Sequence, residues 1–311
     1  VGRPGASYLD APDDVLTATI NEADVRLAPT VGEPPRTLAP DESVRAAISA
    51  LKSASNPLVI VGKGLAWARA ETETREFIER TQVPYLATPM GKGVIPDDHP
   101  LSVAAARTFA LQNADLVVLL GARFNWILHF GLPPRFRPDV RVIQLDIAPE
   151  EISKNVTAEV ALVGDGKAVM GQLNRLLEAE PWQYPAETTW RTGIANAAAE
   201  NEAVTERMMA EDGPPLNYQR VLKDVRDTLP PDTIIVSEGA NTMDIGRAIL
   251  PNFEARTRLD AGTYGTMGVG MGFAIAAAVA NPGKRVVAVE GDAAFGFSGM
   301  EVETMCRYDL P

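Results

Sequence analysis

Short apolar runs that end at glycine or aspartate recur along most of this chain, with helix-like stretches between them. The runs are continuous rather than alternating in polarity, as in 57–62 (PLVIVG) and 114–121 (ADLVVLLG). A strand without alternation is buried on both faces, and strands that are joined through helices pair in parallel. The sequence therefore predicts an α/β protein built on parallel sheets, with helices covering both faces of each sheet.

The strands fall into two groups, so we expect two doubly wound parallel-sheet domains in tandem. A first domain is expected over 41–180, while 11–40 and 181–215 have the composition of linkers, the second of them partly helical. The second domain begins at 216. The expected strands are 57–62, 114–121, 140–146, 160–165, 233–239, 257–260 and 285–292, and the expected helices include 68–82, 217–228, 241–250 and 272–280.

Charge and cysteine usage exclude some classes of partner. The net charge is −12, from 41 acidic and 29 basic residues, which disfavours binding to nucleic acid or to an anionic membrane. No apolar run is long enough to cross a bilayer. The single cysteine, Cys306, cannot form an internal disulfide and favours a reducing compartment, so we expect a cytoplasmic protein. We expect the Cys306 side chain to be packed in the core.

Residues at the strand ends of the first domain are candidates for nucleotide binding. Lys63 lies in a Gly-Lys-Gly turn after the first strand, where backbone N–H groups can meet a phosphate. Arg123, Asp146 and Asp165 follow later strands at the edge where open parallel sheets bind ligands. The alternative for each of them is an ordinary turn residue or a helix cap.

The second domain carries denser signals. Glycines occupy positions 262, 265, 268, 270 and 272, and such density lets the backbone approach a ligand closely. The last predicted strand ends in Glu290-Gly291-Asp292, ahead of a helix that is expected to begin near Ser298. Asp292 either binds a cation whose other ligands lie elsewhere or caps the helix that follows.

Five segments together resemble the thiamine-diphosphate-dependent enzymes that act on acyl-coenzyme A, the 2-hydroxyacyl-CoA lyases first and the oxalyl-CoA decarboxylases second. They are VGRPGASYLD (1–10), DDHPLSVAAARTFALQNADLVVLLGARFN (97–125), EGANTMDIGR (238–247), DAGTYGTMGVGMGFAIAAAVA (260–280) and EGDAAFGFSGMEVETMCRYDLP (290–311). The resemblance implies that 1–10 is the last strand of a missing pyrimidine-binding domain and that 41–180 is a central, Rossmann-like nucleotide-binding domain. It also implies that 216–311 is part of a diphosphate-binding domain. The chain would then be truncated at both ends.

The resemblance also implies a site for thiamine diphosphate and Mg²⁺. Asp292 matches the metal carboxylate, Met267 matches the apolar residue beneath the cofactor, and the carbonyl of Gly265 matches a contact to its amino group. The other matched cofactor contacts are Tyr218, Ala240, Asn241, Thr242, Thr266, Ala293 and Ala294. Alanine at 293 stands where relatives carry glycine or serine, so no hydroxyl is present there. The glutamate that activates the cofactor would lie in the missing domain, so this fragment alone is expected to be inactive.

Coenzyme A and ADP contacts follow in the same way. Ala104, Ala105, Ala106, Arg107 and Thr108 match a loop along the coenzyme A, and Arg247 matches a basic residue on its phosphates. An ordinary surface charge is the alternative for Arg247. The residues that match the ADP site of the decarboxylases are Arg3, Lys63, Arg123, Asp146 and Asp165.

The activity implied is that of a lyase, which splits a 2-hydroxyacyl-CoA into formyl-CoA and a shortened aldehyde through a carbanion on the cofactor. Tyr264 favours the lyase, because lyases carry Phe and decarboxylases carry Trp in this Gly-Thr-x-Gly frame. An oxalyl-CoA decarboxylase is the first alternative, a non-catalytic nucleotide-binding relative is the second, and acetolactate synthase is a weaker competitor. Acyl-CoA and aldehyde substrates and a homodimer or homotetramer are expected.

Overall fold

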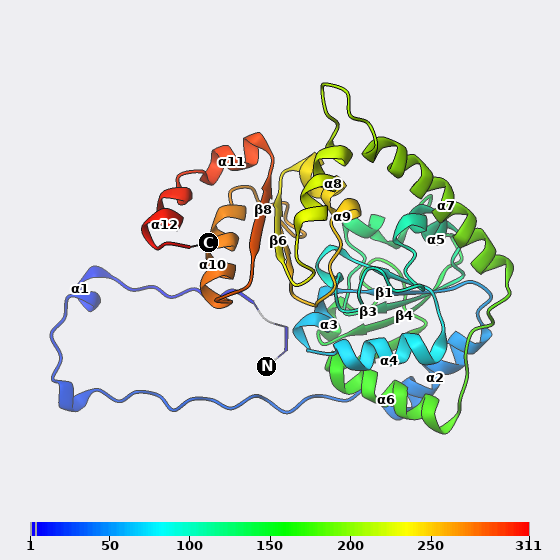
Figure 1. Cartoon of the computed structure of the whole chain (residues 1–311). Coiled ribbons are helices and arrows are strands. Elements are labelled where there is room, and N and C mark those ends of the chain that lie inside the picture. The colour runs from blue at the N-terminus through cyan, green and yellow to red at the C-terminus, as the bar shows by residue number, and fades with distance from the viewer. Residues whose placement is uncertain (1, 4, 311) are drawn as a thin grey trace.

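The computed structural model of this protein describes residues 2–3 and 5–310. Two parallel sheets lie side by side, and helices cover both faces of each sheet (Figure 1). The predicted α/β class with tandem parallel-sheet domains is confirmed.

The first sheet has five strands in the order β2-β1-β3-β4-β5, and every neighbouring pair is parallel. Its strands are β1 (Pro57–Val61), β2 (Tyr85–Ala87), β3 (Leu116–Leu120), β4 (Arg141–Asp146) and β5 (Val160–Val163). Val59 of β1 lies between Tyr85 and Val118 of the two neighbouring strands. Every residue of β1 and β3 is buried, which explains their continuous apolar runs. The short strand β2 was missed, because three residues carry too little pattern.

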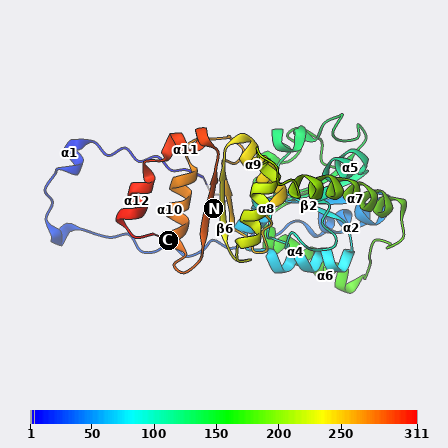
Figure 2. The same ribbon diagram turned by 45° about the horizontal axis from the view of Figure 1, so that its top comes forward.

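The helices of the central domain gather on the two faces of this sheet (Figure 2). They are α2 (Asp41–Ser53), α3 (Lys63–Trp67), α4 (Glu71–Thr81), α5 (Arg107–Asn113), α6 (Gly166–Ala179) and the 3₁₀ turns η2 (Pro89–Gly91), η3 (Ala104–Ala106), η4 (Trp126–Gly131) and η5 (Pro149–Glu151). In α2, acidic residues begin the helix and Lys52 lies in its last turn, as the helix dipole favours. Its buried residues Val44, Ile48 and Leu51 recur at helical spacing. The helix expected over 68–82 is α4, which begins only at Glu71 because Arg69 before it has a φ of +54°.

The second sheet has the order β7-β6-β8, again with parallel neighbours. Its strands are β6 (Ile234–Glu238), β7 (Arg258–Asp260) and β8 (Val286–Glu290), and its helices are α8 (Tyr218–Thr228), α9 (Ala240–Ile249), α10 (Gly270–Ala280), α11 (Asp292–Ser298) and α12 (Glu301–Arg307). α9 packs on one face of the sheet and α10 on the other, with α11 and α12 against α10 (Figure 1). The helix after β8 therefore begins at Asp292, well before the expected start near Ser298.

The stretch between the domains, expected as a partly helical linker, is mostly one helix, α7 (Thr189–Met209). Its Trp190 is buried, stacks on Phe109 with 5.8 Å between ring centroids, and donates from Nε1 to the carbonyl of Pro57 at 3.0 Å. α7 is thus fastened to the central domain along whose outside it runs (Figure 1).

Residues 5–35 are exposed and follow a wide path outside both domains, with only α1 (Asp13–Leu16) and η1 (Glu22–Asp24) as regular structure (Figure 1). The strand expected over 1–10 is absent from residues 5–10, and Val1 and Pro4 lie outside the described residues. A strand needs a neighbour for its hydrogen bonds, and within the described part of the chain residues 5–10 have none. Among the described residues, no helix combines the length and the apolar character that a membrane crossing needs.

Polar side chains join the two domains. Lys92, which follows η2, makes an ion pair with Asp97 at 2.6 Å and donates to the carbonyl of Arg247 at 2.9 Å. Asp97 in turn accepts from the backbone N–H of Asn252 at 2.8 Å. Gly93 has φ of +80°, and a Cβ there would lie 2.0 Å from the carbonyl oxygen of Glu254. The backbones of the two domains are therefore in close contact at this point.

Cys306, expected in the core, is exposed. α12 has no buried residue, because its contacts with α10 leave most of the helix uncovered.

Candidate functional site

The carboxyl ends of β6, β7 and β8 meet at one edge of the second sheet, because the three strands are parallel. The N–H of Gly291 donates to the carbonyl of Glu238 at 3.1 Å, and a Cβ on Gly239 would lie 3.3 Å from the nitrogen of Gly291. The loop 261–269, which follows β7, reaches the same edge through a hydrogen bond from the N–H of Gly268 to the carboxylate of Glu238. The structure thus brings together the three segments that carry most of the predicted cofactor contacts.

Asp292 is the first residue of α11 and its side chain is exposed. Gly291 is the N-cap residue of α11, and this end of the helix has no side-chain cap bond. The alternative that Asp292 caps the helix is therefore not supported by a hydrogen bond. Within residues 2–3 and 5–310, no group of three or more His, Cys, Asp or Glu side chains gathers as a metal site. A single free carboxylate fits a Mg²⁺ that takes its remaining ligands from phosphate oxygens, a backbone carbonyl, an amide and water.

The glycine-rich loop has a backbone that other residues rarely adopt. Gly262, Gly265 and Gly268 have φ values of +64°, +62° and +81°, where a side chain would be strained. The N–H of Gly262 donates to the carboxylate of Asp260 at 2.9 Å, which fixes the start of the loop. Met267, between the last two of these glycines, is 40% exposed. An apolar side chain held at the surface of this edge fits the predicted contact with a cofactor ring.

Sequence reasoning assigned no role to two carboxylates that are buried at this edge. Glu238 ends β6 with no exposed surface, and Glu290 lies beside it in register at the end of β8. Glu238 accepts from the N–H groups of Gly268 and Gly270, whereas both carboxylate oxygens of Glu290 are buried without a partner. Burial, followed by the neighbouring charge of Glu238, raises the pKa of Glu290 to about 7. The repeated Glu-Gly pairs at the ends of two strands were a signal that could have identified them.

Most of the other predicted cofactor residues lie at the starts of helices. Ala240, Asn241 and Thr242 open α9, and Ala293 and Ala294 follow Asp292 in α11. Thr266 is in the exposed part of the glycine-rich loop. Tyr218 opens α8 and is 50% exposed. Their contacts to a cofactor stay predictions.

Three of the five residues predicted to bind ADP, Arg3, Arg123 and Asp146, lie around Glu151, and Lys63 lies near the two arginines. Sequence reasoning missed Glu151. Arg3 and Arg123 make ion pairs with Glu151 at 2.5 and 3.5 Å. Asp146 is buried and accepts from the N–H of Ala148 at 2.9 Å, and burial raises its pKa. Desolvation, and then the charge of Arg123, lowers the pKa of Lys63. Beside these charged residues is a cavity of about 130 Å³, which is lined by Arg123, Phe124, Asn125, Phe130, Gln144, Glu151, Lys154, Asn155 and Val156.

Asp165, the fifth predicted ADP residue, is occupied by structural contacts. It is the N-cap of α6, accepts from the N–H of Ala168 at 3.0 Å, and makes an ion pair with Arg36 at 2.8 Å. The helix-cap alternative therefore accounts for its position.

The residues predicted to contact coenzyme A lie in regular structure instead of a loop. Ala104, Ala105 and Ala106 form η3, while Arg107 and Thr108 begin α5. The Arg107 guanidinium donates to the carbonyl of Ile127 at 2.8 Å. Arg247 makes ion pairs with Asp260 at 3.0 Å and with Asp244 at 2.8 Å. Its charge is therefore already balanced, and a phosphate would have to compete with two carboxylates.

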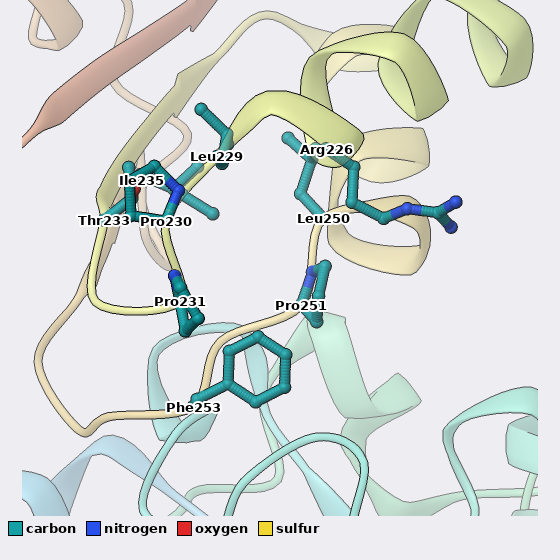
Figure 3. A pocket seen from close by; sticks show the side chains of 9 residues that line it. All are labelled: Arg226, Leu229, Pro230, Pro231, Thr233, Ile235, Leu250, Pro251 and Phe253. Atoms are coloured by element: carbon teal, nitrogen blue, oxygen red, sulfur yellow. The ribbon is translucent and has the colours of Figure 1, made fainter.

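A second, smaller cavity lies at the opposite end of β6, near Thr233, and measures about 30 Å³ (Figure 3). It is lined mainly by apolar side chains and by the three prolines Pro230, Pro231 and Pro251. This space holds about one or two water molecules, so it does not compete with the carboxyl edge as a cofactor site.

Two doubly wound domains, with a glycine-rich loop at the carboxyl edge of the second, are typical of α/β proteins that bind a phosphorylated cofactor. Residues 44–173 match the thiamine pyrophosphate enzyme, central domain, and residues 237–311 match the thiamine pyrophosphate enzyme, C-terminal TPP binding domain. The chain belongs to the thiamine pyrophosphate enzymes, thiamine pyrophosphate being the other name of thiamine diphosphate.

Several curated relatives align with the whole chain. It is 51% identical to "2-hydroxyacyl-CoA lyase 1" of Homo sapiens, over 100% of this chain and 54% of the relative. It is 46% identical to "2-hydroxyacyl-CoA lyase" of Oryza sativa subsp. japonica, over 100% of this chain and 56% of the relative. It is also 46% identical to "Oxalyl-CoA decarboxylase" of Escherichia coli (strain K12), over 100% of this chain and 55% of the relative. The chain thus spans about half the length of these relatives.

Proposed function

We propose that the full-length protein is a thiamine-diphosphate-dependent 2-hydroxyacyl-CoA lyase that releases formyl-CoA and a shortened aldehyde. The observation that carries the proposal is the meeting of 238–242, 261–270 and 290–294 at one sheet edge, with the Asp292 carboxylate free beside them. The higher identity to the human lyase than to the decarboxylase supports the choice of reaction.

Within this proposal each part of the edge has a distinct task. Asp292 would hold Mg²⁺, and the backbone at Ala293 and Ala294 would lie along the diphosphate. Met267 and the carbonyl of Gly265 would fix the orientation of the cofactor rings. When bound, thiamine diphosphate supplies an electron sink for breaking or forming a carbon–carbon bond next to a carbonyl group. The residues of this edge would bind and orient the cofactor, and a Mg²⁺ held by Asp292 would neutralise the charge of the diphosphate.

Substrate contacts are proposed at Arg247 and at 104–108. Charge-assisted bonds between a guanidinium and coenzyme A phosphates are strong, but Arg247 would first have to exchange its ion pairs with Asp244 and Asp260. Arg107 has a lowered pKa, mainly because it is buried and next because of the charges of Arg135 and Arg247. An anion close to these arginines would relieve that repulsion.

ADP binding and assembly are proposed on different grounds. The cavity beside Arg123 and Glu151 supports an ADP site, where phosphates would compete with Glu151 for Arg3 and Arg123. A homodimer or homotetramer is supported by apolar side chains exposed on α11 and its flanks, such as Phe297 at 68% and Met300 at 85%. A cytoplasmic location is supported by the single free cysteine, Cys306.

Oxalyl-CoA decarboxylase remains the second candidate, because the chain is 46% identical to that enzyme of Escherichia coli. A non-catalytic nucleotide-binding relative is disfavoured, because such a protein has no use for a free carboxylate beside a glycine-rich cofactor loop.

The test uses the full-length protein with Mg²⁺ and thiamine diphosphate, offered a 2-hydroxyacyl-CoA and oxalyl-CoA in separate reactions. Formyl-CoA and aldehyde from the first substrate are expected, with loss of both in Asp292→Ala. Carbon dioxide from oxalyl-CoA alone would establish the decarboxylase instead. Turnover of neither substrate, with cofactor bound, would overturn both reactions.

A further inference from the structure

The carboxylate of Glu238 binds the backbone directly after Met267. One oxygen accepts from the N–H of Gly268, and the other accepts from the N–H of Gly270 at 2.5 Å. Glu238 has no exposed surface, so water does not compete for these bonds. A carboxylate with two backbone donors in a dry environment makes strong, directional bonds.

These bonds join the end of β6 to the start of α10. Gly270 is the first residue of that 11-residue helix, and its N-cap, Val269, makes no side-chain cap bond. The first N–H groups of a helix have no partner within the helix, and a negative charge near them is favourable. Glu238, at the end of β6, therefore acts as a capping side chain for α10.

Space around this contact is restricted. A Cβ on Gly270 would lie 2.0 Å from a carboxylate oxygen of Glu290. The backbone carbonyl of Glu238 also accepts from the N–H of Gly291, the residue before Asp292. Glu238 is thus bonded both to the segment that follows Met267 and to the segment that precedes Asp292.

We propose that Glu238 is a positioning residue, which holds the loop that carries Met267 in register with the segment that carries Asp292. The relevance of this register to thiamine diphosphate rests on the proposed function. The positioning of the loop does not rest on the proposed function, because it follows from hydrogen bonds within the chain. Glu238 touches no reacting atom in this assignment.

The test compares Glu238→Gln with Glu290→Gln in the full-length protein by hydrogen exchange. Glutamine keeps the size of the side chain, but its NH₂ group cannot accept, so one glycine N–H loses its partner. In Glu238→Gln we expect the amides of 265–270 to exchange about tenfold faster or more. Glu290→Gln removes a neighbouring carboxyl group that makes no bond to the loop, and exchange there is expected to stay within about twofold of the wild type.

The second measurement is the affinity for thiamine diphosphate with Mg²⁺, read by quenching of intrinsic fluorescence. We expect Glu238→Gln to weaken the affinity about tenfold or more, because the loop is no longer preorganised. Faster exchange without any cofactor binding by the wild type would refute the proposed function and leave the positioning role standing. Unchanged exchange in Glu238→Gln, or an equal rise in both variants, would overturn the positioning role.

If Glu238→Gln does not fold, the wild type and Glu238→Asp carry the test. In the wild type, the amides of Gly268 and Gly270 should exchange as slowly as the amides of β6, because both are bonded to a buried carboxylate. Rapid exchange of these two amides would overturn the proposal. Aspartate is one methylene shorter, so Glu238→Asp is expected to speed their exchange although the charge is kept. Wild-type exchange rates in that variant would overturn the proposal as well.

Discussion

Replacing Gly93 with alanine should loosen the junction between the two domains. A Cβ at position 93 would lie 2.0 Å from the carbonyl oxygen and 2.4 Å from the carbonyl carbon of Glu254. Both atoms are backbone, so no rotamer change relieves the overlap, and residues 252–255 must move. That movement strains the bond between Asp97 and the N–H of Asn252, at 2.8 Å.

The loss of unfolding free energy in Gly93→Ala has two parts, backbone strain and steric overlap. An alanine with φ near +80° costs about 1–2 kcal/mol, offset by about 0.4–1 kcal/mol from the less flexible unfolded chain. Forcing extra volume into a packed contact adds about 1–3 kcal/mol. Gly283 is the matched control, because its φ is +89° and a Cβ added there would have no atom within 4 Å. Gly283→Ala should therefore lose about 1 kcal/mol, and Gly93→Ala about 2–4 kcal/mol.

The assay is chemical unfolding of both variants, with hydrogen exchange at Asn252 as a local reading of the junction. Faster exchange of the Asn252 amide is expected in Gly93→Ala and not in Gly283→Ala. Equal losses of stability in the two variants would refute the reasoning, because the overlap with Glu254 would then contribute nothing.

Three further predictions concern single side chains. Asp292→Ala should change the free energy of unfolding by less than about 0.5 kcal/mol, because its carboxylate is exposed. Mg²⁺-dependent cofactor binding, measured by calorimetry, should be lost in this variant. A large loss of stability would contradict a free carboxylate. Trp190→Phe should lower the free energy of unfolding by about 1–2 kcal/mol, since the Pro57 carbonyl loses its donor. Trp67→Phe, on the exposed surface of α3, should change it little when both variants are compared by thermal unfolding. Glu290 has its pKa raised from 4.5 to about 7, so its contribution is fully present below about pH 4.5 and is lost as the pH rises through 7. The free energy of unfolding is measured against pH with metal chelated, and Glu290→Gln should remove about 1–3 kcal/mol of its change between pH 4.5 and pH 7. If this change with pH is the same in the variant and the wild type, Glu290 ionises normally.

Sequence patterns predicted most of the strands but showed less about the segment between the two domains. Continuous apolar runs located β1, β3, β4, β5, β6 and β8, and burial on both faces explains the runs of β1, β3 and β6. The anchoring of α7 depends on Trp190 reaching Phe109 and Pro57, residues far away in the chain, so composition alone suggested a linker.

Sequence reasoning predicted which segments would form the candidate site, but not the ion-pair partners of its charged side chains. Glycine spacing and the Glu-Gly-Asp turn pointed to segments that the structure brings together at the carboxyl edge of the second sheet. The pairing of Arg247 with Asp260 and of Arg3 with Glu151 depends on tertiary contacts, which no local pattern encodes. Cys306 was placed in the core on the expectation of a packed helix, and α12 has no buried residue.

The bonding of Glu238 also has a consequence for the order of folding. Its partners lie 30, 32 and 53 residues further along the chain, at Gly268, Gly270 and Gly291. Parallel strands pair only after a crossover has formed, and such distant contacts are slow to form. Until α10 and β8 are in place, a carboxylate at the end of β6 has no donors and resists burial. The second domain should therefore complete its sheet edge late and cooperatively, and a folding intermediate would keep Glu238 in contact with water.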